Sequence, residues 1–144
     1  MTITHDFAYH RPATLAEAVA LLAEGGEGTW VLAGGTDLVP WLRDDAVHPD
    51  ALVDLKRIDG LRDITEADGA VSIGALVTFT DLLESRLIAE RLPLLGEAAA
   101  TVASVGVRNR ATLAGNLCSA GPSGDAGPAL RCPAALLRGT GPGG

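Results

Sequence analysis

The sequence predicts an α+β domain made of two small lobes. Apolar runs of strand length alternate with helical segments before residue 58, and a hairpin signal follows soon after it. A chain of 144 residues with 47% apolar content can form one domain with a real core, though not comfortably two. We therefore expect a first α/β lobe over residues 1–58, a second lobe over 59–130, and an atypical, disordered tail at 131–144 that is rich in glycine and proline.

The first lobe is expected to begin with a helix. The letters TLAE at residues 14–17 form a capping box, and the apolar residues that follow recur at helical spacing until a glycine pair at 25–26. These signals predict a helix over about residues 15–23. The apolar run WVLA at 30–33 then predicts a short buried strand.

The rest of the first lobe completes a β-α-β arrangement. Asp37 is placed to cap a helix that continues through Arg43, in which Pro40 falls in the first turn. The run ALVDL at 51–55 predicts a second buried strand.

The second lobe starts with a predicted hairpin. Asp68-Gly69 is a dipeptide favoured in tight turns, so strands are expected at 61–65 and 70–75. Thr80 is expected to cap a helix over 81–85, and Pro93 suits the first turn of a helix that runs to about Ser104.

Residues 107–126 are dense in glycine, asparagine, serine, threonine and proline, which predicts a long ordered loop after Gly106 has ended the preceding helix. Loops of this length within compact domains are usually functional or disordered.

Composition excludes several classes of function. The net charge of -7 disfavours a nucleic-acid partner and an anionic membrane surface, since both select for Lys and Arg. The first thirty residues show no apolar run that would serve as a signal peptide or a membrane helix, so a cytoplasmic protein without membrane insertion is expected. Cys118 and Cys132 form no metal-ligand pattern and are expected to be reduced thiols. No catalytic acid–base pair and no metal site is predicted.

Two glycine loops carry the chemistry. They read AGGTDL at 33–38 and TLAGNL at 112–117. Main-chain N–H groups at a tight glycine turn form an anion site without a lysine, which suits a diphosphate. In the first loop Thr36 can donate a hydroxyl hydrogen; in the second, Thr112, Gly115 and Asn116 offer a hydroxyl, open backbone and an amide. Taken singly, each loop is at least as well explained as an ordinary turn, because glycine marks turns more often than ligand sites.

Other nucleotide motifs are absent or out of place. The letters GTGPGG at 139–144 satisfy G-x-G-x-x-G, but that pattern indicates a dinucleotide site only between a strand and a helix. Neither a P-loop nor a G-x-S-x-G nucleophile motif occurs.

The order of the motifs resembles that of a known family. After the first helix come AGGTDL, an Ile73-Gly74-Ala75 strand, the Pro93 helix, VRN at 107–109, TLAGNL, and SAGP at 119–122 leading to Asp125. Over residues 1 to about 130 this resembles the FAD-binding subunit of the molybdenum hydroxylases, the family of xanthine dehydrogenase, aldehyde oxidase and carbon monoxide dehydrogenase.

The resemblance implies a PCMH-type FAD-binding fold, in which two α+β lobes clasp FAD. The second lobe would be incomplete, because family members continue well beyond this length, and a truncated reading is expected. Ala114 departs from the usual second glycine and would crowd the approach slightly. The implied cofactor-binding residues are Val31, Leu32, Ala33, Gly34, Gly35, Thr36, Asp37, Leu38, Thr112, Gly115, Asn116 and Asp125.

The resemblance also implies a function. The chain would be the flavin-dependent electron-transfer subunit of a heterotrimeric molybdopterin dehydrogenase, passing electrons from [2Fe-2S] clusters through FAD to NAD+ or another acceptor. An iron–sulfur small subunit and a molybdopterin large subunit would be its partners, and the substrate would be selected at the large subunit. Two alternatives stay open: a truncated, non-catalytic nucleotide-binding or assembly fragment, and, less favoured, an oxidase with covalent flavin, for which the glycine loops lack an attachment His or Cys.

Overall fold

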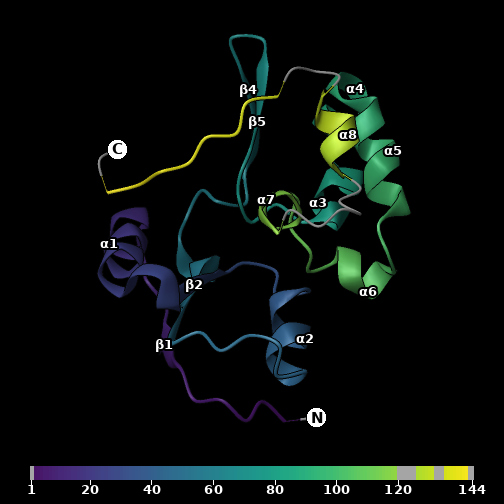
Figure 1. The fold of residues 1–144 in the computed structure, drawn as a ribbon. Helices are drawn as coiled ribbons and strands as arrows, with labels where there is room; N and C mark the ends of the chain where they lie inside the picture. The colour runs from purple at the N-terminus through teal and green to yellow at the C-terminus, as the bar shows by residue number, and fades with distance from the viewer. Residues whose placement is uncertain (1, 120–125, 132–134, 143–144) are drawn as a thin grey trace. The chain divides into compact units, whose positions relative to one another are not determined.

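The computed structural model describes residues 2–119, 126–131 and 135–142. They form two compact units, which we call unit 1 (Met1–Asp59 with Arg138–Gly144) and unit 2 (Gly60–Leu137). Figure 1 shows the helices and strands of both units.

Unit 1 contains a parallel sheet of three strands. They are β1 (Ala8–His10), β2 (Thr29–Leu32) and β3 (Ala51–Asp54), in the order β1-β3-β2. Helix α1 (Leu15–Gly25) joins β1 to β2, and α2 (Leu38–Arg43) joins β2 to β3. Strand β1 was not predicted; its three residues form a largely exposed edge strand without an apolar pattern.

The first helix begins at the capping box that the sequence predicts. The Thr14 hydroxyl accepts a hydrogen bond from the Glu17 N–H, and the Glu17 carboxylate accepts one from the Thr14 N–H in return. The core of unit 1 is small and is built by α2 and β3. Leu38, Leu42 and Leu52 are buried there, with Trp30 and Leu32 of β2 packed against them.

The expected capping role of Asp37 is wrong. Asp37 does occupy the N-cap position of α2, but its side chain makes no capping hydrogen bond. Its backbone is already in the helical region (φ −100°, ψ −49°), whereas a capping side chain normally requires an extended residue.

Unit 2 begins with a hairpin of β4 (Ile64–Ala67) and β5 (Ala70–Ile73), which pair antiparallel. Its turn lies at Asp68-Gly69 as predicted, with φ values of +52° and +76°. Positive φ at both central residues is what a two-residue hairpin of this kind requires. Strand β4 begins at Ile64 and continues to Ala67, where 61–65 was expected, and β5 ends at Ile73, where 75 was expected.

Six short helices follow among the described residues of unit 2. They are α3 (Phe79–Glu84), α4 (Arg86–Arg91), α5 (Pro93–Thr101), α6 (Val105–Arg108), α7 (Leu113–Cys118) and α8 (Ala126–Arg131). Helices α3, α4 and α8 pack against α5 (Figure 1). The buried core that they share includes Phe79, Leu82, Ile88 and Leu95.

Two predictions about unit 2 are wrong. Thr78, not Thr80, caps α3, because Asp81 lies three residues after Thr78 and returns a hydrogen bond to the Thr78 N–H. The long loop expected over 107–126 contains α7, and α6 spans its start. Each of these helices begins at a capping hydroxyl, that of Ser104 for α6 and that of Thr112 for α7. Each contains a single glycine, whose low helix propensity is too small a cost to prevent the helix.

No helix within the described ranges is both long enough and apolar enough to cross a membrane.

Candidate functional site

The first glycine loop joins β2 to α2 in unit 1. Val31 and Leu32 end the strand, residues 33–37 form the loop, and Leu38 is the first residue of α2. Gly35 has a φ of +76°, and a Cβ there would lie 3.1 Å from Leu32 Cδ1 and 3.2 Å from Val39 Cγ2. This backbone therefore requires glycine at position 35.

The loop leaves a run of main-chain donors unused. Within the described part of the chain, the N–H groups of residues 34–38 donate no hydrogen bond to a protein acceptor. The first N–H that does so is that of Val39, which donates to the Gly35 carbonyl at 3.0 Å. Consecutive free N–H groups at a glycine turn suit an anion such as a diphosphate. Leu38 can contribute only its backbone, since its side chain is buried in the core.

The second glycine loop lies in unit 2 and is held by the start of α3. Thr78 and Thr112 form an isolated antiparallel bridge, flanked by hydrogen bonds from Phe79 N to Ala111 O (3.0 Å) and from Leu113 N to Val77 O (3.1 Å). Both threonines are buried, and each caps a helix. The backbone of this loop is therefore fixed by unit 2 itself.

Gly115 serves the structure of this loop in a specific way. Its N–H donates to the Thr112 hydroxyl at 3.0 Å, and a Cβ at position 115 would lie 2.7 Å from that oxygen. The N–H of Gly115 is thus already used, and the open backbone expected here makes room for the capping hydroxyl. Thr112 keeps its own hydroxyl hydrogen for another acceptor.

Asn116 carries an unsatisfied acceptor. Its side-chain Oδ1 is withdrawn from solvent and has no hydrogen-bond partner among the residues that the structure describes. Leaving such an atom unpaired costs about 1–3 kcal/mol. A hydroxyl donor of a ribose or ribityl chain would satisfy this oxygen. With the amide turned over, its NH₂ group would occupy the same position and could donate to a phosphate instead. Asp125, the remaining predicted ligand, lies outside the described residues.

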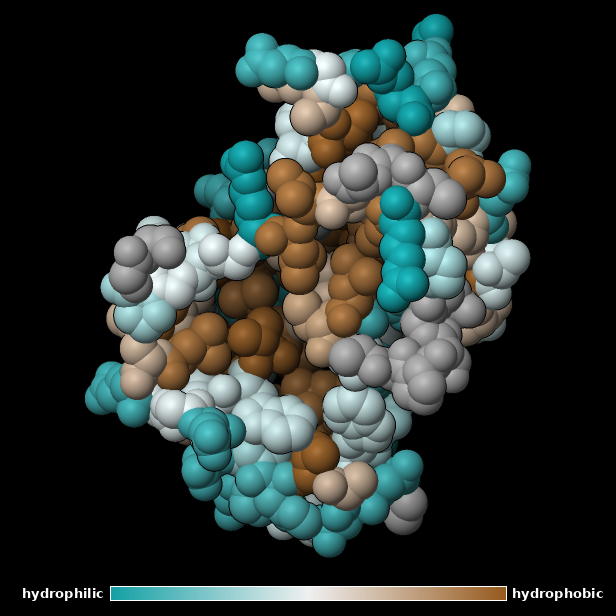
Figure 2. Space-filling view, turned by 45° about the horizontal axis from the view of Figure 1, so that its top comes forward, coloured by the Kyte–Doolittle hydropathy of each residue, from teal (hydrophilic) through white to brown (hydrophobic). Residues whose placement is uncertain are grey.

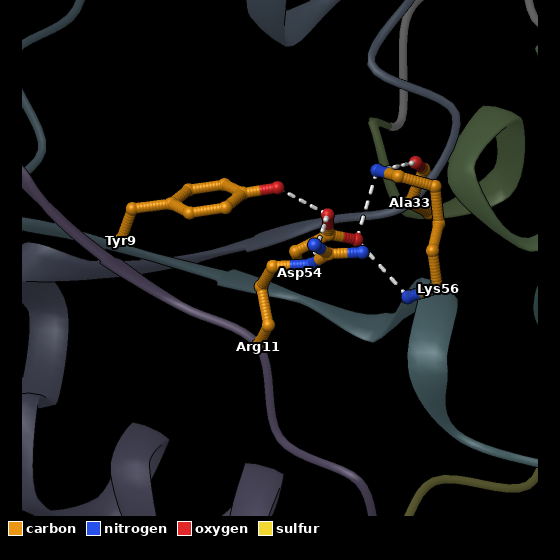
Figure 3. Close-up of polar contacts among 5 residues, drawn as sticks. All are labelled: Tyr9, Arg11, Ala33, Asp54 and Lys56. Carbon is orange, nitrogen blue, oxygen red and sulfur yellow. Dashed lines mark hydrogen bonds and ion pairs between the residues drawn. The ribbon is translucent and has the colours of Figure 1, made fainter.

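A cluster of polar side chains lies beside the first loop (Figure 3). Asp54, at the end of β3, is only 1% exposed. Its carboxylate accepts hydrogen bonds from the Lys56 side chain (2.8 Å), the Lys56 N–H (3.0 Å) and the Tyr9 hydroxyl, and Arg11 Nε lies 4.0 Å away. Lys56 Nζ also donates to the Ala33 carbonyl at 3.3 Å.

These contacts determine the ionisation of the cluster. Burial raises the pKa of Asp54, but the hydrogen bonds from Lys56 and Tyr9 outweigh burial, so the pKa is lowered overall. The same hydrogen bond to Asp54, together with burial, raises the pKa of Tyr9. The carboxylate is therefore charged and the phenol neutral near neutral pH.

Sequence reasoning missed this cluster, although two signals were present. Lys56 is the only lysine in the chain, and Asp54 interrupts an otherwise apolar strand. A carboxylate in a buried strand requires cationic or hydrogen-bonding partners nearby. No three His, Cys, Asp or Glu side chains within the described ranges are grouped in a way that could hold a metal ion.

Comparison with known proteins agrees with the site chemistry. The family model described as "FAD binding domain in molybdopterin dehydrogenase" matches residues 5–144. The chain is 43% identical over 119 residues to the carbon monoxide dehydrogenase medium chain of Hydrogenophaga pseudoflava, covering 83% of this chain and 42% of the relative. It is 43% identical over 122 residues to the xanthine dehydrogenase FAD-binding subunit of Escherichia coli O157:H7, covering 83% of this chain and 41% of the relative.

Solved structures give the same result for the fold. A chain of reconstituted CO dehydrogenase from Oligotropha carboxidovorans superposes with a TM-score of 0.84 at 38% identity, covering 87% of this chain and 44% of that chain. The α+β architecture is thus the PCMH-type FAD-binding fold. The chain spans less than half the length of these relatives. With the family model matched over nearly all of its residues, the chain belongs to the FAD-binding domains of the molybdopterin dehydrogenases.

Proposed function

We propose that this chain binds FAD as part of a molybdopterin-dependent dehydrogenase. Residues 31–38 of unit 1 would bind the diphosphate, and Thr112, Gly115, Asn116 and Asp125 would contribute from unit 2. The observation that carries the proposal is the run of N–H groups at residues 34–38 without a protein acceptor. The unpaired Oδ1 of Asn116 supports it independently.

The redox chemistry would belong to the cofactor, which accepts electrons and passes them on. The chain's own residues would bind and orient it: the first loop through main-chain N–H groups, and Thr112 and Asn116 through side chains. No residue of the chain is assigned a catalytic proton transfer.

In the full assembly, we propose that electrons arrive from [2Fe-2S] clusters on an iron–sulfur small subunit, after substrate oxidation at a molybdopterin large subunit. They would leave to NAD+ or another acceptor, in the cytoplasm. This part rests on membership of the family.

A second candidate is a non-catalytic nucleotide-binding or assembly fragment. In this candidate the N–H groups of residues 34–38, which have no protein acceptor among the described residues, would hold the phosphates of a nucleotide without a competent flavin. The division of the FAD-binding domain into a first lobe at 1–58 and a second lobe at 59–130 stays part of the first proposal.

An absorbance spectrum distinguishes the two candidates. The purified chain is scanned before and after incubation with excess FAD and desalting. Retained bands at about 370 and 450 nm, as expected for a bound oxidised flavin, support FAD binding. A colourless chain refutes FAD binding by these residues alone. Retention of ADP by that colourless chain then supports the fragment, and loss of ADP as well refutes both candidates.

A further inference from the structure

We propose that Lys56 is a positioning residue for the diphosphate loop: by holding the Ala33 carbonyl, it keeps the N–H of Gly34 facing the anion. The inference rests on the proposed function for the identity of the ligand. It starts from the position of Lys56 in the sheet. Leu32 of β2 and Asp54 of β3 are partners in the parallel register, so residue 33 and residue 56 leave the sheet at the same edge.

The lysine is itself held firmly. Its Nζ lies 2.8 Å from Asp54 Oδ1, and that carboxylate is fixed in turn by the Lys56 N–H and the Tyr9 hydroxyl (Figure 3). A lysine in solvent would be too mobile to orient a peptide group. Here the buried carboxylate removes most of that freedom.

The contact with Ala33 fixes the direction of the next N–H group. The described peptide bonds are all trans, so the N–H of Gly34 points opposite to the carbonyl of Ala33. With the carbonyl 3.3 Å from Lys56 Nζ, the Gly34 N–H faces away from the cluster and belongs to the run that has no protein acceptor.

The Ala33 carbonyl needs a fixed partner because two glycines follow it in the loop. The peptide between Ala33 and Gly34 is followed by residues that tolerate many backbone conformations, so rotation of its plane costs little. A rotated peptide would turn the Ala33 carbonyl oxygen toward the phosphates, replacing an attraction with a repulsion. Lys56 opposes that rotation while leaving the Gly34 and Gly35 backbone open to the ligand.

The test compares three variants of the full chain. Lys56→Met keeps the apolar stem and removes the donor, and Lys56→Arg restores a cationic donor. Arg11→Gln is the matched control, since Arg11 also lies near Asp54, at 4.0 Å, while the contact to Ala33 is made by Lys56. FAD affinity is measured by quenching of flavin fluorescence, thermal unfolding is recorded for each variant, and the carbonyl ¹³C resonance of Ala33 is followed by NMR without ligand.

We expect Lys56→Met to bind FAD about tenfold more weakly, the effect of one lost charge-assisted hydrogen bond. Lys56→Arg should recover most of the affinity, and Arg11→Gln should leave it unchanged. The Ala33 carbonyl resonance should shift in Lys56→Met only. Unchanged FAD affinity in Lys56→Met, or an equal loss in Arg11→Gln, overturns the proposal.

Two further outcomes are decided by the same measurements. If the unmodified chain binds no FAD, the proposed function fails for this chain. The Ala33 resonance alone then tests whether Lys56 holds the Ala33 carbonyl: a shift in Lys56→Met supports this contact, and no shift refutes it. If Lys56→Met does not fold, the folded chain is trimethylated at its only lysine instead, which keeps the positive charge and removes every N–H donor of Nζ. Trimethylation that leaves both FAD affinity and the Ala33 resonance unchanged then refutes the proposal, and a change in either supports it.

Discussion

Gly35 is the residue at which the first loop is most sensitive to a side chain. Its φ of +76° disfavours any L residue, and a Cβ would press on Leu32 and Val39 at 3.1 and 3.2 Å. We predict that Gly35→Ala costs about 1–3 kcal/mol of unfolding free energy from backbone strain and crowding together. It should also weaken FAD binding, because relief of the contact moves the N–H groups of the loop. Urea unfolding and a flavin titration measure the two effects.

Gly69 provides the control for backbone strain alone. It has the same φ of +76°, but nothing lies within 4 Å of a Cβ there. Gly69→Ala should therefore cost about 1 kcal/mol, from conformation only, and leave FAD binding unchanged. If Gly35→Ala costs no more than Gly69→Ala and binds FAD normally, the contacts of Leu32 and Val39 with position 35 do not constrain the loop.

Asp54 makes stability depend on pH in the acid range. Its pKa in the folded state lies below the ordinary value of 3.8. The folded state therefore binds fewer protons than the unfolded state around that pH, so the stabilisation is full above about pH 5 and is lost as pH falls through the folded pKa. Asp54→Asn should cost about 2–4 kcal/mol at pH 7, because charged hydrogen bonds to a buried group are lost.

The measurement is urea unfolding from pH 7 down to pH 2. Asp54→Asn should show a smaller loss of stability below pH 4 than the unmodified chain. Asp44→Asn, a change at an exposed carboxylate, should keep the acid loss of the unmodified chain. An identical acid loss in Asp54→Asn would show that the Asp54 contacts contribute little to stability.

Helix caps carry much of the local order at the scale of elements. Thr112 caps α7 through the Gly115 N–H, and Thr14 caps α1 through the Glu17 N–H. Thr→Val at either position removes the hydroxyl with little change of shape, and each should cost about 1 kcal/mol. Only Thr112→Val should also weaken FAD binding, since Thr14 lies outside both glycine loops. Calorimetry and a flavin titration on both variants separate the two effects, and equal affinity in the two would argue against a ligand role for Thr112.

The same caps explain how far the sequence could predict this fold. The Thr14 box and the Asp68-Gly69 turn were found because their signals are local and complete within a few residues. The glycine-rich composition of residues 107–126 predicts a loop, yet the capping hydroxyls of Ser104 and Thr112 suffice for helices of one or two turns there. The cap of α3 is Thr78 and not the predicted Thr80, because only Thr78 has Asp81 at the third helical position.

The two glycine loops of the candidate site could be located from the sequence alone, but the contacts of Asp54 and Lys56 could not be predicted from it. Lys56 reaches Ala33 across 23 positions of sequence, and that contact depends on the β2 and β3 register. Parallel strands are joined by long crossover connections, so the residues that meet across them are far apart in the sequence. The chemistry of the loop was therefore predictable, whereas the groups that orient it were not.

At the scale of the whole molecule, several large apolar side chains are exposed to solvent. Leu136 is 87% exposed, Leu137 73% and Val105 63%, all in unit 2. Figure 2 shows apolar residues reaching the surface among hydrophilic ones on the face that it presents. Soluble monomers rarely expose large contiguous apolar patches, so we expect the isolated chain to self-associate and to be less soluble than a chain extended to the length of its relatives.

A double change at the two most exposed leucines tests where that association arises. Leu136→Gln with Leu137→Gln removes two side chains whose burial between copies would be worth about 1.5–3 kcal/mol each. Sedimentation velocity should show a shift toward the monomer in the double variant. Leu94→Gln, at a leucine of α5 that is 53% exposed, is the control and should have a smaller effect. An unmodified chain that sediments as a monomer at high concentration would contradict the expectation. The exposed leucines would then cause no self-association.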